Sequence, residues 1–309
     1  MNAGLLLRDS AVALATPFSA GEVDTEALSA LCERQITRGT TALVVCGSTG
    51  EASSLSAREY ASVVRAVAEA AGGRLPVIAG CGAAATAAAA ALAAAAAAAG
   101  ADGILCAPPA YVKPTQEGIF GHVRAVGHAA GLPLVLYDVP ARTGVAVADE
   151  TVARLFERRS IIAVKDATGD LSRPPRLRAL CGGNLVQMSG DDATAAAYRA
   201  MGGHGCVSVT ANLTPALCAR LHGSWDEHGL DEFASTRDLL APLHQALFVE
   251  SNPIPLKAAL VMLRLCPGEI RLPLTKATYA TRDRLADLLA HIMNVEEAVA
   301  RRHSSVLVN

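Results

Sequence analysis

The chain has 309 residues, is 51% hydrophobic and carries a formal net charge of −2. This length allows one large domain or two smaller ones with a sizeable core. The near-neutral charge argues against nucleic acid or an anionic membrane as a partner, and the apolar part of the N-terminus is too short for a signal peptide. Its eight cysteines form no C-x-x-C pair and no zinc-like spacing with histidine, so we expect reduced, packed thiols in a cytoplasmic protein and no metal site.

Short apolar runs bounded by Gly, Pro or Asp recur along the chain. In chain order they cover residues 11–18, 42–50, 76–82, 102–109, 133–140, 161–168, 185–192 and 205–212. The runs are continuous rather than alternating, which is typical of parallel strands buried on both faces. The segments between them have helical composition, with Asp24 and Ser56 as expected N-caps and Gly39 and Gly72 as expected stops. This order predicts an α/β fold, a (β/α)8 TIM barrel.

An alanine tract at residues 83–99 lies between two of these runs, and we expect it to form the third barrel helix, ended by Gly100. From about Leu230 the strand pattern disappears and the composition is helical. We therefore divide the chain into a barrel domain, residues 1–229, and a C-terminal helical extension, residues 230–309.

One motif is typical of dinucleotide binding. The stretch "GCGAAA" at residues 80–85 follows a strand and opens a helix, as in G-x-G-x-x-A. The acidic residue that binds ribose should stand at the end of the next strand, whereas Asp102 stands before it. We therefore expect no nicotinamide cofactor.

Polar residues gather at the carboxyl ends of the expected strands, the face on which active sites of this fold are built. They are Ser48, Thr49, Glu51, Tyr111, Lys113, Tyr137, Arg142, Lys165, Asp191, Asp192, Thr210 and Asn212. Lys165 directly follows the buried run 161–164, where an ammonium group would lose its hydration. Either this lysine reaches past the strand to solvent or to a carboxylate, or its amine is kept nearly dry for chemistry.

A dry amine at this place could act as a nucleophile. Burial favours the neutral form of a lysine, which can condense with a ketone to give a Schiff base, an electron sink for making an enamine. Tyrosine suits the accompanying proton transfers, and arginine suits the carboxylate of a second substrate. The turn formed by Ser48, Thr49 and Gly50 could offer N–H groups and hydroxyls to the carboxylate of a 2-oxo acid. Such chemistry needs no cofactor and no metal.

Five motifs carry a family resemblance. They are, in order, "GSTGE" (47–51), "LYDVPARTG" (136–144), "AVKDATGDL" (163–171), "GGHGCVSVTAN" (202–212) and "NPIPLKAAL" (252–260). Together they resemble the dihydrodipicolinate synthase family, which belongs with the N-acetylneuraminate lyases to the pyruvate-dependent class I aldolases. The resemblance extends to about Arg282. It implies a synthase that condenses pyruvate with L-aspartate 4-semialdehyde in diaminopimelate and lysine biosynthesis.

The resemblance also implies catalytic roles for single residues. Lys165 is similar to the Schiff-base lysine, and Tyr137 to the tyrosine that moves protons at the imine. Ser48 and Tyr111 resemble the other two members of a hydroxyl relay. In the family the residue at the Tyr111 position is lent by a neighbouring subunit. We therefore expect a homo-oligomer that is at least a dimer, and we expect a tetramer.

The same resemblance places Thr49 at the pyruvate carboxylate, Arg142 at the carboxylate of aspartate semialdehyde, and Val207 and Gly190 in the pocket wall. Asp138 stands where asparagine is common, and Ser48 where threonine is common, which keeps the hydroxyl. Two alternatives stay open: a lyase or aldolase of keto-deoxy sugar acids that uses the same lysine, and a barrel that only binds ligands. Arg142 favours the synthase, unless it makes only a surface ion pair.

In feedback-sensitive members of the family, lysine binds polar and aromatic side chains at the dimer interface. The corresponding positions here are Ala57, Tyr60, Ala84, Ala88 and Ala110. We expect Ala84 and Ala88 to lie one helical turn apart, where they offer only methyl groups. This predicts an enzyme that lysine does not inhibit, unless Tyr60 or Glu51 compensates.

Overall fold

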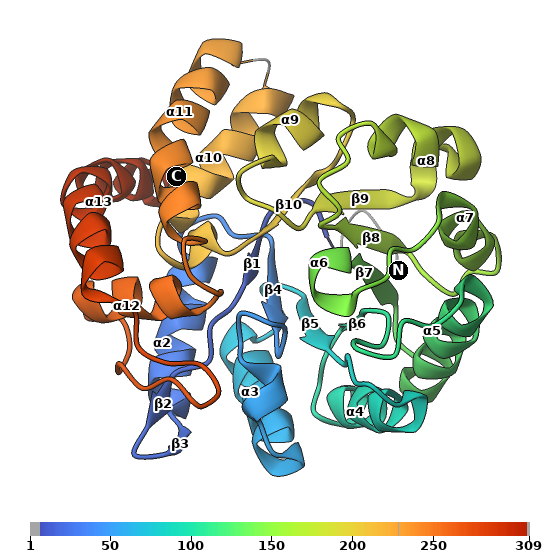
Figure 1. Cartoon of the computed structure of the whole chain (residues 1–309). Coiled ribbons are helices and arrows are strands. Elements are labelled where there is room, and N and C mark those ends of the chain that lie inside the picture. The colour runs from blue at the N-terminus through green and yellow to red at the C-terminus, as the bar shows by residue number, and fades with distance from the viewer. Residues whose placement is uncertain (1–6, 228, 308–309) are drawn as a thin grey trace.

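The computed structural model describes residues 7–227 and 229–307. Eight parallel strands close into a barrel, with helices around it (Figure 1). The strands are β1 (Asp9–Ala13), β4 (Ala42–Val45), β5 (Val77–Gly80), β6 (Gly103–Cys106), β7 (Leu134–Asp138), β8 (Ala163–Asp166), β9 (Val186–Ser189) and β10 (Gly205–Ser208). Closure occurs because β1 pairs with both β4 and β10. The (β/α)8 barrel predicted from the apolar runs is thus confirmed.

The barrel helices fill the segments between the strands. They are α2 (Thr25–Ile36), α3 (Ala57–Ala71), α4 (Thr86–Ala98), α5 (Gln116–Ala130), α7 (Asp149–Glu157), α8 (Arg173–Cys181), α9 (Ala195–Ala200) and α10 (Pro215–Asp226). The expected caps form at Asp24, which accepts from the Ala27 N–H, and at Ser56, which makes a capping box with Glu59. Gly72 ends α3 in the left-handed conformation, but α2 ends before Gly39, with Thr37 as its cap.

Two local expectations were wrong. The run 11–18 does not form one strand, because β1 ends at Ala13 and a small hairpin follows, made of β2 (Phe18–Ser19) and β3 (Glu22–Val23). The alanine tract becomes helical only at Thr86, after Ala85 as an N-cap without a side-chain hydrogen bond. Ala84 therefore precedes the helix and does not share a helical face with Ala88.

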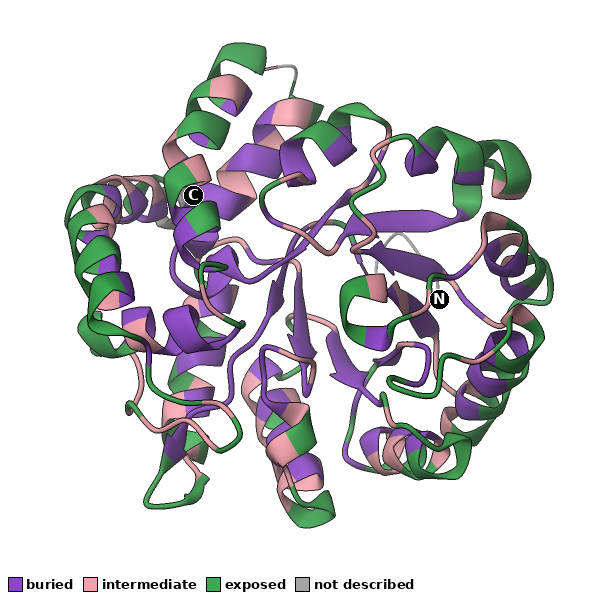
Figure 2. Cartoon of the chain, viewed as in Figure 1, coloured by how far each residue is buried: buried purple, intermediate pink, exposed green. Residues whose placement is uncertain are grey.

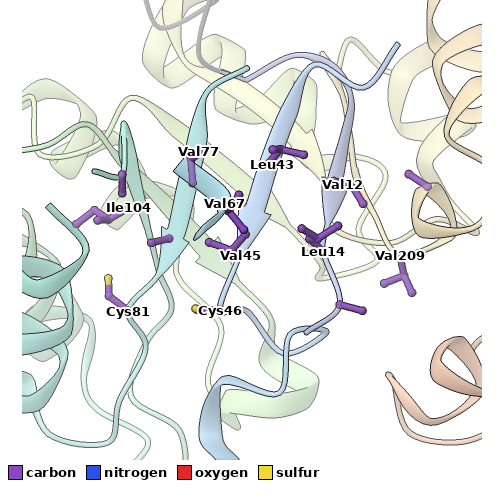
Figure 3. Packing of buried hydrophobic residues seen from close by; sticks show 14 of the residues in the cluster. Val12, Leu14, Leu43, Val45, Cys46, Val67, Val77, Cys81, Ile104 and Val209 are labelled. Atoms are coloured by element: carbon purple, nitrogen blue, oxygen red, sulfur yellow. The ribbon is translucent and has the colours of Figure 1, made fainter. Parts of the chain in front are cut away.

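Apolar side chains form two layers of core. The inner layer fills the barrel with residues such as Val44, Leu105 and Met188. The outer layer lies between strands and helices, where Val67 of α3 belongs to the same cluster as Val45 of β4 (Figure 3). The barrel strands are consequently buried along almost their whole length, whereas the helices expose their outer faces (Figure 2).

The chain ends in a helical extension, as predicted, formed by α11 (Leu230–Ala246), α12 (Ile254–Met262) and α13 (Tyr279–Leu307). Helix α13 contacts α10, α11 and α12, which places the extension on one side of the barrel (Figure 1). Shorter pieces are α6 (Pro140–Thr143) and the 3-10 turns η1 (Ala52–Ser54), η2 (Gly182–Asn184) and η3 (Thr210–Asn212). Within residues 7–227 and 229–307, none of the helices has the length and apolar character that a membrane span requires.

Candidate active site

A cavity of about 220 Å³ opens at the carboxyl ends of the barrel strands. Its lining includes Gly47, Ser48, Thr49, Tyr137, Val139, Ala141, Arg142, Lys165, Ala167, Gly190, Asp191, Val209, Phe248 and Asn252. The strand ends of β4, β7, β8 and β9 thus contribute residues that lie far apart in the sequence. Six of the eight catalytic and substrate-binding residues predicted from the sequence line it together; Tyr111 and Val207 do not.

Lys165 lies on β8 with its side chain only 6% exposed. It is the register partner of Tyr137 on β7, and its Nζ is 4.3 Å from the centroid of the Tyr137 ring. None of the carboxylates in the described part of the chain makes an ion pair with it. One alternative was that Lys165 makes a structural ion pair. The described residues include no carboxylate that pairs with it.

A second buried lysine shows what a structural role looks like. Lys257 of α12 is 3% exposed, and its Nζ lies 2.5 Å from Glu51 Oε1. The same amine donates to the Glu269 carbonyl at 2.8 Å. Burial lowers the pKa of Lys257, and the Glu51 carboxylate opposes this shift by favouring the ammonium form. Both lysines are buried, but Lys257 has a carboxylate partner, whereas Lys165 lines the cavity and has none among the described residues.

Gly190 makes room for the Lys165 side chain. A Cβ at this position would lie 2.9 Å from Ala167 Cβ and 3.1 Å from Lys165 Cε. Any larger residue would press on the chain that carries the amine. Gly190 lies outside the five motifs; the resemblance places it in the pocket wall, and the packing explains why this residue is a glycine.

The turn after β4 is held from several sides. Asn252 Nδ2 donates to Thr49 Oγ1 at 3.0 Å, and both side chains are buried. Glu51 adopts a left-handed conformation with φ of 51°, and its N–H donates to the Ser48 carbonyl. Lys257 fixes the Glu51 carboxylate, as described above. Asn252, just before α12, and Lys257, within it, therefore fix the turn that follows β4. Asn252 stands first in the "NPIPLKAAL" motif and is a site residue that sequence reasoning missed.

Other residues at the strand ends serve the scaffold. Asp192 accepts from Ser208 Oγ and from the N–H groups of Val209 and Thr210. Asn212 accepts from the Ala15 N–H and donates to the Ala13 carbonyl, so it ties the end of β10 to β1. Asp191 lines the cavity, but its carboxylate accepts from Thr194 Oγ1. Hydrogen bonding explains these residues without a catalytic role.

Tyr111 does not reach the cavity of its own chain. Its side chain is 93% exposed and its φ is +74°, an uncommon conformation for a bulky residue. Lys113 follows with a φ of +45°. Val207 lies in the inner core against which Tyr137 packs, and Val209, two residues further on, lines the cavity. The roles implied for Tyr111 and Val207 therefore stay predictions.

Arg142 stands on α6 at the mouth of the cavity. Its guanidinium donates to the Asn252 carbonyl at 3.3 Å. It makes no ion pair with a carboxylate of the described residues, so the alternative of a surface ion pair finds no partner there. Its guanidinium makes no further hydrogen bond to a described residue, so its remaining N–H groups are available to a ligand carboxylate.

Asp138, which follows Tyr137, is fully buried and lies 2.7 Å from an Arg173 nitrogen. Burial raises the pKa of this carboxyl, while Arg173 and the Val147 N–H act in the opposite direction. Its contacts lie with α8 and the segment before α7, and it does not line the cavity. The aspartate that replaces the family's common asparagine at position 138 therefore belongs to the scaffold behind the site and not to the cavity lining.

Fold and cavity together define a (β/α)8-barrel enzyme with a buried lysine where the strands end, one that has no ion-pair partner in the part of the chain that the structure describes. The sequence model of the Dihydrodipicolinate synthetase family matches residues 6–292, and the chain belongs to this family. A 4-hydroxy-tetrahydrodipicolinate synthase from Rhodospirillum centenum is 48% identical over 278 residues, which is 90% of this chain and 96% of that protein.

Solved structures agree with this assignment. A chloride-inhibited dihydrodipicolinate synthase from Acinetobacter baumannii, complexed with pyruvate, is 41% identical and superposes with a TM-score of 0.88, covering 92% of this chain and 98% of that one. A dihydrodipicolinate synthase variant described as the first monomeric one is 34% identical with a TM-score of 0.90, covering 94% and 98%.

Proposed function

We propose that the protein condenses pyruvate with L-aspartate 4-semialdehyde, the reaction of 4-hydroxy-tetrahydrodipicolinate synthases, in diaminopimelate and lysine biosynthesis. One observation carries the proposal: the Lys165 amine is buried, has no counter-charge among the described residues and lies against Tyr137 in the cavity. The names of the relatives and the pyruvate in the Acinetobacter baumannii complex support the choice of substrates.

In the proposed reaction the Lys165 amine attacks the keto carbon of pyruvate, and loss of water gives an imine. The imine withdraws electrons, so that the methyl group loses a proton and becomes a nucleophilic enamine carbon. This carbon forms the new bond with the aldehyde carbon of the second substrate, whose oxygen takes up a proton. The amino group of that substrate then attacks the imine carbon, closes the ring and displaces the Lys165 amine. Tyr137 moves protons at the imine, with Ser48 as the next hydroxyl. The imine is itself the electron sink, so the proposal includes no cofactor and no metal.

Binding of pyruvate is assigned to the turn after β4. Thr49 would hold the carboxylate through its hydroxyl and the N–H groups of the turn, while Asn252 fixes the Thr49 side chain. Gly190 would form part of the wall behind it, and Val207, which the resemblance also assigns to this wall, lies in the inner core and not on the cavity surface. The rigid support of this turn favours a small, fixed anion such as the carboxylate of a 2-oxo acid.

Arg142→Ala is expected to raise the KM for aspartate semialdehyde at least about tenfold, because a hydrogen bond to a charged group contributes about 1.5–3 kcal/mol. The KM for pyruvate should stay within about twofold, since the carboxylate of that substrate is assigned to Thr49 and the turn after β4 and not to Arg142. Steady-state kinetics with each substrate varied in turn measures both values. Equal effects on the two substrates would contradict the assigned role of Arg142.

The alternative substrates are N-acetylneuraminate and 2-keto-3-deoxy sugar acids, which lyases of the same superfamily cleave. These compounds are polyols, for which a free guanidinium at the mouth is a weaker match than it is for a second carboxylate. Assaying one purified sample against aspartate semialdehyde with pyruvate, against N-acetylneuraminate and against keto-deoxygluconate tests the proposal. Turnover of either sugar acid with no condensation activity would overturn it.

We also propose that the enzyme is a homo-oligomer, at least a dimer and specifically a tetramer. We further propose that it acts in the cytoplasm. The description of one related structure as the first monomeric variant supports an oligomeric norm for such enzymes. The side chain of Tyr111 projects from its own subunit, as a residue lent to a neighbour would. The eight cysteines are free in this structure, which suits a reducing compartment.

Mixing inactive Tyr111→Phe subunits with inactive Lys165→Ala subunits should restore part of the activity after subunit exchange. A mixed dimer then contains one cavity with both an intact Lys165 and an intact Tyr111. The recovered activity is measured after mild dissociation and reassociation of the two variants. A fully active monomer in sedimentation analysis would contradict this prediction.

Lysine is expected not to inhibit the enzyme. Ala57, Ala84, Ala88 and Ala110 are exposed but offer no polar group, and desolvating the three charges of lysine without partners costs several kcal/mol. Neither proposed compensator offers a polar group at the surface of the chain, because Tyr60 is 2% exposed and Glu51 is buried and paired with Lys257. The measurement is a titration of lysine to millimolar concentration in the coupled assay. A specific lysine site would inhibit at concentrations below about 1 mM, and clear inhibition in that range would count against the prediction.

A further inference from the structure

Directly behind the two proposed catalytic side chains lies a pair of buried carboxylates. Asp138 follows Tyr137 on β7, and Asp166 follows Lys165 on β8. Strand β7 pairs with β8 so that Tyr137 is opposite Lys165 and Asp138 is opposite Asp166. Successive residues of a strand point to opposite faces, so the carboxylates lie on the helix side of the strands. Both are buried, with exposures of 0% and 3%.

A single arginine contacts both carboxylates. Arg173, the first residue of α8, is 2% exposed, and its Nη1 lies 2.7 Å from Asp138 Oδ2 and 3.5 Å from Asp166 Oδ1. Its Nε donates to Asp149 Oδ1 at 2.8 Å and its Nη2 to the Val147 carbonyl at 2.7 Å. All three guanidinium nitrogens are therefore engaged, Nη1 with the two strand-end carboxylates and the other two with the segment that contains Val147 and Asp149.

These contacts join the elements that carry the site. Like charges directly opposite each other on neighbouring strands repel, and burial strengthens the repulsion. The guanidinium between Asp138 and Asp166 offsets it and fixes the two strand ends against each other. The contacts of Arg173 and Asp138 with Val147 also close the segment 139–147, which contains Arg142. One side chain thus links the supports of Tyr137, Lys165 and Arg142.

We propose that Arg173 is a positioning residue that holds Tyr137 and Lys165 in the register required for imine formation. This inference rests on the proposed function, in which Lys165 forms the imine with pyruvate. A displacement of about 1 Å in a reacting group can cost about 100-fold in rate, so a loosened pair of strands has a large effect on chemistry. A residue with only a structural role would change the stability and leave the rate of imine formation unchanged.

The matched pair Arg173→Met and Arg176→Met separates these roles. Arg176 lies on the same helix and also bonds Asp149, but its side chain is 46% exposed and it contacts neither Asp138 nor Asp166. The readout is the rate at which borohydride traps pyruvate on Lys165, measured well below the thermal midpoint of each variant. We expect trapping to slow at least about tenfold in Arg173→Met and to stay within about twofold in Arg176→Met.

Arg173→Lys keeps one positive charge but lacks the planar fork, and we expect it to recover only part of the trapping rate. This variant also carries the test if Arg173→Met does not fold. The inference would be overturned if folded Arg173→Met trapped pyruvate as fast as the unchanged enzyme. If Arg173→Met does not fold, the same result in Arg173→Lys would overturn it. A missing Lys165 adduct in the unchanged enzyme would instead overturn the proposed function.

Discussion

Lys165→Ala is expected to lower kcat/KM by about 10⁴-fold or more, because removal of a nucleophile abolishes the covalent route. The amine has no counter-charge in the described residues, so its removal leaves no buried carboxylate unpaired. The thermal midpoint should therefore change little. Steady-state kinetics together with a thermal melt measures both quantities.

Two other lysines serve as controls for this substitution. Lys257→Ala leaves Glu51 buried without its partner, so we expect a loss of about 3–5 kcal/mol in the free energy of unfolding. Lys276 is exposed and Lys276→Ala should change neither activity nor stability. Residual activity of Lys165→Ala above about 1% of the unchanged enzyme would contradict the assignment of the nucleophile.

Tyr137→Phe is expected to lower kcat by about 10²- to 10³-fold, because a positioned acid–base group contributes rate enhancements of this order. The change removes one hydroxyl and little volume, and the ring continues to lie against Lys165. The KM for pyruvate should therefore stay within a few-fold. Initial rates and a pyruvate titration measure the two values separately.

Tyr60→Phe is the matched control for this substitution. Tyr60 is also buried, but its hydroxyl has no hydrogen-bond partner among the described residues and it does not line the cavity. We expect its kcat to equal that of the unchanged enzyme. Full activity in Tyr137→Phe would show that proton transfer depends on another group.

The barrel and most of the site could be predicted from the sequence, because both depend on local patterns. Continuous apolar runs define buried parallel strands, and the shared orientation of these strands brings their end residues to one rim. Lys165, Tyr137, Ser48, Thr49 and Arg142 line one cavity for this reason.

Other features depend on contacts between distant segments, which no local pattern encodes. The sequence does not reveal that Lys257 has a carboxylate partner whereas Lys165 has none, nor that Gly190 leaves space for the Lys165 side chain. Asn252 reaches Thr49 across about 200 positions of the chain. The start of α4 was misplaced because its N-cap is Ala85, which makes no side-chain hydrogen bond and so leaves no mark in the sequence of where the helix begins.

Reductive trapping tests the central claim most directly. The enzyme is incubated with pyruvate alone and treated with borohydride, which converts an imine into a stable amine, and the adduct is located by peptide mass mapping. We predict one pyruvate-derived adduct per chain, on the peptide that contains Lys165, and none in Lys165→Ala. An adduct on Lys257 or another lysine, or no adduct in the unchanged enzyme, would contradict the account.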